Sequence, residues 1–172
     1  MRVFAWSCGA WQQAGADFVG ESYDFLGMSA SLSSAGTVLA LGLPGTHDDK
    51  DSFSGSYDWV DGKGGTIQVY EWNGGTTSWD PLVDDIDSES WIHDYTYAEA
   101  YFYEVLTGPA LGKAVRLAGD GSAVAVGGTR YVSPDLRNTR DSSSQLVRQQ
   151  GFGRTYELPA RSATGTPGDS FC

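Results

Sequence analysis

Short apolar runs, separated by stretches rich in glycine and serine, recur along most of this chain. One pair of runs covers residues 29–32 and 37–42, and Ser33-Ser34-Ala35-Gly36 joins them. Two short apolar runs joined by a glycine-containing turn are typical of a β-hairpin. The pattern therefore predicts two antiparallel strands in this region.

The same hairpin pattern returns later, with strands expected over 114–117 and 122–127 and the turn Ala118-Gly119-Asp120-Gly121 between them. The second strand of each hairpin is apolar at every position, from 38 to 41 and from 123 to 126. A strand of this kind is buried on both of its faces. We therefore expect both strands to lie inside a stack of sheets.

A third strand is predicted over residues 67–72, where apolar and polar positions alternate more clearly. The run ends in the aromatic residues Tyr70 and Trp72. Alternation of this kind is typical of a strand with one face exposed. We expect it to lie outside the apolar strand in the same sheet.

Four segments of the chain recur in the same order, with insertions only between them. Each match is weak by itself, but their shared order indicates an internal repeat. The matched pairs are residues 2–6 with 68–72, 17–22 with 85–90, 26–42 with the region 85 positions later, and 65–71 with 151–157.

The composition agrees with many short strands and tight turns, since the 172 residues include 23 glycines, 6 tryptophans and 9 tyrosines. Repeated sheets whose inner strands need cover on both faces must stack on one another. A β-propeller, in which sheets called blades are arranged around an axis, satisfies this requirement. A β-sandwich is the main alternative, but it does not predict a long-range sequence repeat.

Particular residues resemble FG-GAP repeats, the blade units of propellers like that of the integrin α-subunit. Gly27 stands at the position of the "FG" glycine and Gly42-Leu43-Pro44 at the position of "GAP". The later copy has Leu111-Gly112 and Gly127-Gly128-Thr129 at the same places. The resemblance covers about residues 1–158 and also includes Gly65–Trp72.

The resemblance implies an all-β repeat protein, a partial β-propeller of about two four-stranded antiparallel blades. It implies recognition of a ligand or protein rather than catalysis, and an extracellular or cell-surface location. The units expected are 1–10 as the last strand of a preceding blade, 11–78 as one blade, 79–158 as a second blade with an insertion at 91–108, and 159–172 as a tail with little order.

Calcium is not expected at the hairpin turns, although related blades often carry an Asp-rich calcium loop there. The corresponding turns here are Ser33–Gly36 and Ala118–Gly121, which contain a single aspartate, Asp120. A calcium ion takes six or more oxygen ligands. We assign no catalytic, cofactor-binding or metal-ligating residue from the sequence.

The formal net charge of −11 argues against nucleic acid or an anionic membrane as a partner. No run approaches the length of a membrane-spanning helix, and the N-terminal run is short and interrupted, so we expect no signal peptide. Cys8 and Cys172 lie near the two ends, and they could pair only if those ends meet.

Two groups of charged residues are candidates for a metal, ligand or catalytic site. His47-Asp48-Asp49-Lys50-Asp51, with Asp58 and Asp61 further on, lies in a long polar stretch, where a solvated loop is favoured over a cation or ligand contact. Asp84-Asp85-Ile86-Asp87-Ser88-Glu89 could supply paired carboxylates for hydrolysis. Because Asp17 and Glu21 occupy the matching positions of the earlier copy, a structural role is favoured for these acids.

The insertion at 91–108 holds the lone pair His93-Asp94, and no motif places a nucleophile beside it. It is also rich in aromatic side chains, which make good contact surfaces. The sequence is equally consistent with a second role, in which these side chains cap an apolar sheet edge. The aromatic residues are Trp91, Tyr95, Tyr97, Tyr101, Phe102 and Tyr103.

Two blades would leave exposed end faces, which favour association. The chain is therefore expected to be a fragment or half of an oligomeric ring, with a protein ligand, a glycan or further blades as its partner. A non-catalytic binding or adhesion module is the leading function. A carbohydrate-binding propeller fragment comes second, and a hydrolase that uses the acids at 84–89 comes third.

Overall fold

The computed structural model describes residues 1–21, 24–45, 65–88, 110–131, 150–161 and 165–168. These residues form an all-β protein in which every strand pairing is antiparallel. Within them, no helix is long and apolar enough to cross a membrane. The strands are β1 (Phe4–Ser7), β2 (Ala10–Gln13), β3 (Ser29–Leu32), β4 (Val38–Leu43), β5 (Thr66–Asn73), β6 (Ser78–Pro81), β7 (Ile86–Asp87), β8 (Ala114–Leu117), β9 (Ala123–Tyr131) and β10 (Gln150–Glu157).

The largest sheet, here called the central sheet, has the order β3-β4-β5-β6, and β7 also pairs with β5. Strands β6 and β7 lie along the same edge of β5, because β6 pairs with residues 70–73 and β7 with residues 66–67. The strand β5 is therefore internal to the sheet, and Ile67, Val69 and Trp72 are buried. Residues 67–70 alternate between buried and half-buried positions, in line with the expected half-exposed strand, whereas Trp72 is buried because Ala14 and Gly15 pack on it.

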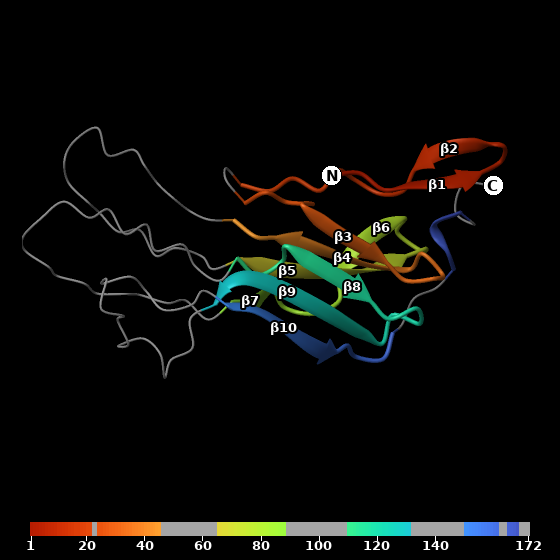
Figure 1. Ribbon diagram of the computed structural model, residues 1–172. Coiled ribbons are helices and arrows are strands. Elements are labelled where there is room, and N and C mark those ends of the chain that lie inside the picture. The colour runs from red at the N-terminus through yellow and green to blue at the C-terminus, as the bar shows by residue number, and fades with distance from the viewer. Residues whose placement is uncertain (22–23, 46–64, 89–109, 132–149, 162–164, 169–172) are drawn as a thin grey trace, which may run out of the picture.

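Two smaller sheets cover the faces of the central sheet. The N-terminal hairpin consists of β1 and β2, and the C-terminal sheet has the order β10-β9-β8. Figure 1 shows the three sheets as successive layers. Within the described residues the sheets do not close into a ring.

The apolar strand β4 is buried at all six of its positions, as the sequence predicts. Its side chains alternate between two separate cores. Leu39, Leu41 and Leu43 pack toward the N-terminal hairpin together with Val3, whereas Val38 and Ala40 pack toward the C-terminal sheet. The other buried members are Ala14, Trp72 and Trp79 on the hairpin side, and Ile67, Val69, Leu111, Leu117, Val124 and Val126 on the other.

Strand pairing follows the same register in the two larger sheets. Leu39 lies opposite Leu32 and Tyr70 in the central sheet, and Val124 lies opposite Leu117 and Tyr156 in the C-terminal sheet. These are the positions that the sequence repeat matches. Leu39 and Val124, 1% and 0% exposed, therefore occupy equivalent places.

The turns that connect these strands also match. In the β3–β4 turn, Gly36 has a φ of 69° and its N–H donates to Ser33 O; Gly121 has a φ of 73° and donates to Ala118 O, both at 2.9 Å. Glycine adopts this left-handed conformation without steric cost. The repeat thus extends from strand pairing to backbone conformation.

The N-terminal hairpin repeats the outer strands of the central sheet. Trp6 lies opposite Trp11 in the hairpin, as Trp72 lies opposite Trp79 between β5 and β6. The boundaries between the sheets therefore differ from the unit boundaries that were expected from the sequence. The boundaries between residues 10 and 11 and between 78 and 79 are each crossed by an antiparallel pair, because the two tryptophans of each pair face each other across it.

The expected four strands per unit are found only in part. The central sheet contains four strands in order with β7 added, and the C-terminal sheet contains three among the described residues. Of the tail at 159–172, the structure describes 159–161 and 165–168, and Ser7 Oγ donates a hydrogen bond of 2.9 Å to Gly168 O. Residues 165–168 therefore lie beside the N-terminal hairpin (Figure 1).

The close approach of two sheets at Gly42 yields the first testable prediction. A Cβ on Gly42 would collide with Gly112 O and Ser29 Oγ, so Gly42→Ala should lower the free energy of unfolding by about 3 kcal/mol. Gly75→Ala is the control, because a Cβ there meets only Asn73 Oδ1 at 3.4 Å. Urea unfolding followed by circular dichroism measures both, and equal midpoints for the two variants would contradict this packing.

Candidate binding surfaces

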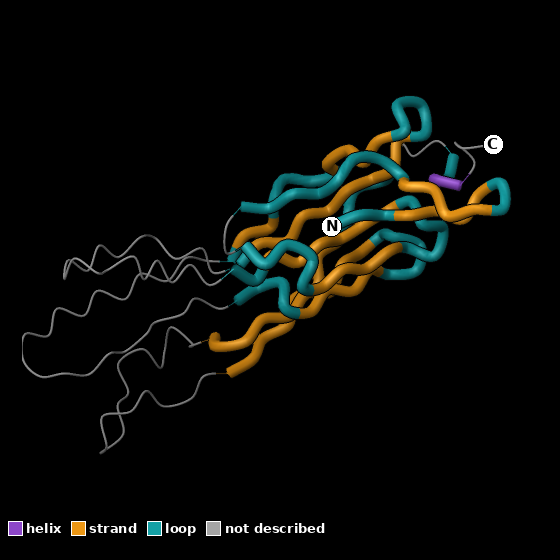
Figure 2. Tube along the Cα trace, turned by 90° about the horizontal axis from the view of Figure 1, so that it is seen from above, coloured by secondary structure: helices purple, strands orange, loops and turns teal. Residues whose placement is uncertain are grey.

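One candidate surface lies at the end of the stack formed by the end of β4 and the start of β5, here called the junction end. Strand pairs meet there: Leu43 pairs with Thr66, Thr66 with Asp87, and Tyr131 with Gln150. Ser88 N donates to Gly65 O at 3.0 Å. Residues 43–45, 65–66, 87–88, 131 and 150 therefore lie near one another at this end (Figure 2).

A shallow depression of about 260 Å³ lies at the junction end. Its polar lining comes from β5, from the turn before β7 and from the loop before β3. The residues that give it its chemistry are Glu21, Asp24, Thr66, Gln68 and Asp85. The depression thus carries carboxylates, an amide and a hydroxyl in one place.

Hydrogen bonds fix the side chains on one side of this depression. Gln68 Nε2 donates to Asp85 Oδ2 at 3.1 Å, and Tyr70 OH donates to Gln68 Oε1 at 2.9 Å. Burial, and then the charge of Asp85, raise the pKa of Tyr70 above its ordinary value. The phenol is therefore a stable donor, and it orients the amide that faces the depression.

The opposite side of the depression is a turn that holds itself together. Glu21 N donates to Asp24 Oδ2 at 2.7 Å, Asp24 N donates to Glu21 O at 3.3 Å, and Gly45 N donates to Asp24 O at 3.2 Å. These bonds tie the loop before β3 to the end of β4. One carboxylate oxygen of Asp24 is thus used to build the turn.

The acids that recur in the repeat have structural partners. Arg2 binds Asp17 with an N–O distance of 2.8 Å, and Gln13 Nε2 donates to the same carboxylate at 2.8 Å. The hydrogen bonds from Arg2 and Gln13 lower the pKa of Asp17 below its ordinary value. In the central sheet Gln68 and Asp85 occupy the positions of Arg2 and Asp17, so the interaction itself is repeated.

Asp120, the single aspartate of the hairpin turns, has a similar role. Its Oδ1 accepts hydrogen bonds from Ser122 N at 2.9 Å and Ser122 Oγ at 2.7 Å. These bonds lower its pKa, the backbone bond being the largest cause. Among the described residues, no group of three or more His, Cys, Asp or Glu side chains is placed to hold a metal ion.

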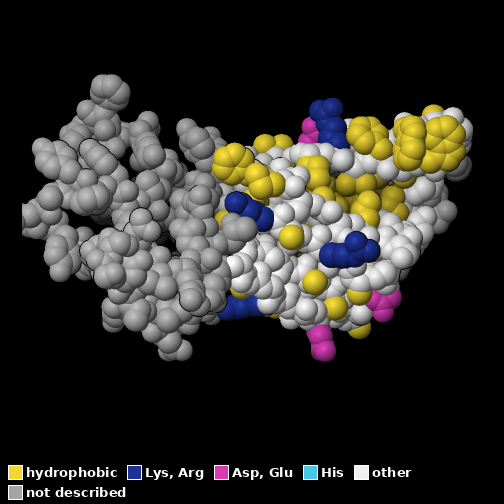
Figure 3. Space-filling view, in the orientation of Figure 1, with side chains coloured by type: hydrophobic (Ala, Val, Ile, Leu, Met, Phe, Trp, Pro, Cys, Tyr) yellow, Lys and Arg dark blue, Asp and Glu magenta, His cyan; other side chains and the backbone are white. Residues whose placement is uncertain are grey.

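A second candidate surface is aromatic and lies on the N-terminal hairpin. Phe4, Trp6 and Trp11 are 49%, 60% and 67% exposed. Trp6 and Trp11 make an edge-to-face contact with ring centroids 5.5 Å apart. Figure 3 shows hydrophobic side chains gathered over this hairpin.

The equivalent pair of the central sheet has the same geometry but is covered. Trp72 and Trp79 lie edge to face at 5.3 Å, and they are 0% and 9% exposed. Trp79 Nε1 donates to Ala14 O at 3.0 Å, and a Cβ on Gly15 would come within 2.8 Å of Trp79 Cδ1. The end of the hairpin thus packs directly on this tryptophan pair.

Several residues considered from the sequence lie outside the described part of the chain. They are His47–Asp51, Asp58, Asp61, Glu89, the whole insertion at 91–108 and Cys172. Cys8 is disulfide-bonded. It lies in the turn between β1 and β2, where its φ is 51°.

The sequence did not identify Gln68, Asp24 or the exposed tryptophan pair as parts of a surface. The alternation of β1 carries a usable signal, because Val3 and Ala5 point to one face and Phe4 and Trp6 to the other. Aliphatic residues on one face and aromatic residues on the other indicate that both faces of β1 are apolar. The depression gives no comparable signal, since it combines residues from three separate parts of the chain.

Comparisons with known proteins add nothing to this picture, because no family model, no curated protein and no solved structure matches the chain. The two surfaces therefore rest on their geometry alone.

The two tryptophan pairs provide a matched test of the repeat. Trp72→Ala should reduce the free energy of unfolding by about 3–5 kcal/mol, because it removes a buried ring. Trp6→Ala, at the equivalent position, should change it by no more than about 0.5 kcal/mol, because the ring is exposed. Urea unfolding measures both, and similar losses at the two positions would contradict the difference in cover.

Proposed function

We propose that the chain is a non-catalytic binding module, of the adhesion type, built from stacked blades of a partial β-propeller. The observation that carries this proposal is the depression at the junction end, where separate parts of the chain bring carboxylates, an amide and a hydroxyl together. The stacked sheets position the loops that carry Glu21, Asp24 and Asp85, and binding residues are commonly placed on loops that a scaffold positions. The acidic net charge of −11 favours ligands other than nucleic acid.

The blade interpretation is supported by the order of the sheets. Each contains antiparallel strands in sequence order, and each packs a face on the next sheet. This is the arrangement expected of adjacent propeller blades, and the resemblance to FG-GAP repeats implies the same. Extracellular or cell-surface placement follows from that resemblance.

A non-catalytic role is favoured by the use of the recurring acids. Asp17 and Asp85 hold neighbouring side chains, and Asp87 accepts a hydrogen bond of 2.6 Å from Thr66 Oγ1. A general acid in a glycosidase needs a raised pKa, whereas the pKa of Asp17 is lowered. The hydrolase hypothesis therefore ranks below binding.

Carbohydrate is the second candidate ligand class, after a protein ligand. The polar depression offers the carboxylates of Glu21 and Asp85 and the amide of Gln68, which suit sugar hydroxyls. The aromatic residues Trp91 and Tyr101 follow in the sequence after Ser88, which is bonded to Gly65 at the same end. A protein ligand is the first form, since tyrosine-rich segments suit protein contacts.

The proposal predicts that labelled protein binds members of a glycan array or of an array of secreted and cell-surface proteins. Trp91→Ala or Tyr101→Ala should weaken binding by about tenfold or more. Ala35→Arg is the control, because Ala35 lies in the exposed β3–β4 turn outside both candidate surfaces, and it should leave binding unchanged.

Asp85→Asn combined with Glu89→Gln separates binding from hydrolysis. Turnover of an arrayed glycan that is lost in this double variant would contradict a non-catalytic role. Binding that is insensitive to both Trp91 and Tyr101 would contradict the role of the junction end.

A further inference from the structure

The stack of sheets has a direction. We define the front face of a sheet as the face that carries the positions of Leu39 and Trp72, and the back face as the face that carries the positions of Val38 and Ala40. The front face of the central sheet receives the N-terminal hairpin, and its back face receives the C-terminal sheet. Both interfaces therefore join the back face of one sheet to the front face of the next.

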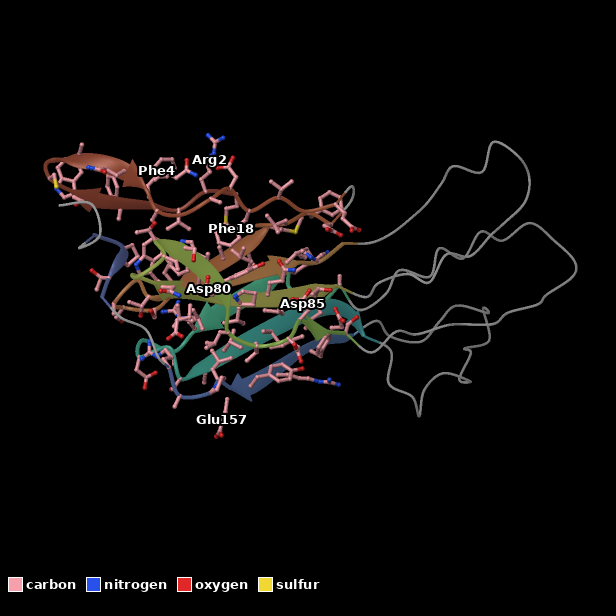
Figure 4. The ribbon with its side chains drawn as sticks, turned by 180° about the vertical axis from the view of Figure 1, so that it is seen from behind. Arg2, Phe4, Phe18, Asp80, Asp85 and Glu157 are labelled. Carbon is pink, nitrogen blue, oxygen red and sulfur yellow. The ribbon has the colours of Figure 1, made fainter. Side chains whose placement is uncertain are left out.

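The two open faces at the ends of the stack are consequently one of each kind. The hairpin presents a front face, with Phe4 and Trp6 at the positions of Tyr70 and Trp72. The C-terminal sheet presents a back face that includes Glu157. Figure 4 shows Phe4 at one end of the stack and Glu157 at the other.

The tryptophan pair on the open front face of the hairpin has nearly the same geometry as the pair on the covered front face of the central sheet. The Trp6–Trp11 pair differs from the Trp72–Trp79 pair by 0.2 Å in centroid distance (5.5 against 5.3 Å) and by 9° in interplanar angle (73° against 64°). The buried pair shows what such a surface accepts: the back face of another sheet, with Val3, Ala14 and the backbone at Gly15 against the rings.

The open back face has room for large rings. Ala125, Gly153 and Thr155 are exposed and occupy the positions of Ala40, Ile67 and Val69. Two of these positions carry smaller or more polar residues than their buried counterparts. Among the described residues, a Cβ on Gly153 would meet only Val126 O within 4 Å, at 3.6 Å.

We propose that the aromatic front face of the N-terminal hairpin docks on the back face of the C-terminal sheet in a second copy of this chain. The contact continues the back-to-front order of the two internal interfaces. Thr155 of one copy lies toward Phe4 and Trp6 of the other, as Val3 lies toward Tyr70 and Trp72 within the chain. A contact between two different surfaces is heterologous, so it forms either a closed ring or an open-ended chain of copies.

This inference depends on the repeated registers, not on the proposed ligand binding, and its test uses other residues. Sedimentation velocity of the full chain over a concentration series should show a mass above that of the monomer. The double substitution Trp6→Ser with Trp11→Ser, or the single substitution Thr155→Arg, should weaken association by about 30-fold or more. Ala35→Arg, in the exposed β3–β4 turn, is the matched control and should associate like the wild type.

Mixing the two deficient variants gives the sharpest outcome. Each retains one intact face, so the mixture should form a one-to-one dimer although each variant alone is a monomer. At concentrations where the wild type is monomeric, circular dichroism and urea unfolding of the variants should match the wild type, since all three substituted side chains are exposed. A wild-type chain that stays monomeric at every concentration, or variants that fail to complement each other, would overturn the proposal.

Discussion

Burial of β4 on both of its faces is the constraint on which the rest of the structure depends. A six-residue strand with no exposed position cannot be stable in a single sheet, so a layer must lie on each side. The hairpin and the C-terminal sheet supply those layers, and their own faces toward β4 are apolar for the same reason. The covered tryptophan pair follows from this requirement, because the layer that covers Leu39 and Leu41 also covers Trp72 and Trp79.

Much of the fold could be predicted from the sequence because hairpins and buried strands depend on local patterns. Apolar runs and glycine turns predict strands over 29–32, 37–42, 114–117 and 122–127, which the structure has as β3, β4, β8 and the first part of β9. The matched segments also place Leu39 and Val124 at equivalent positions, as the structure does. The division of the chain into sheets was less accessible. Whether Ala10–Gln13 pairs with the strand before it or with one after it depends on partners distant in sequence, and the short strand β7 has only two paired residues.

The candidate surfaces were harder to predict than the strands. The carboxylates at 84–87 could be recognised as repeat positions, but their partners Gln68 and Thr66 lie on another strand, and only the register of β5 brings them together. The exposure of Trp6 and Trp11 has a similar origin. Their sequence pattern equals that of Trp72 and Trp79, and the two pairs differ only in whether another sheet lies on them.

Amide hydrogen exchange measured by NMR tests the two-sided burial of β4 most directly. Amides of Val38–Leu43 that are bonded to β3 and β5 should exchange only through global unfolding, with an opening free energy equal to that from urea unfolding. Amides of the N-terminal hairpin should exchange faster, because its outer face is open. Exchange of the β4 amides at the rate of the hairpin amides would contradict the account.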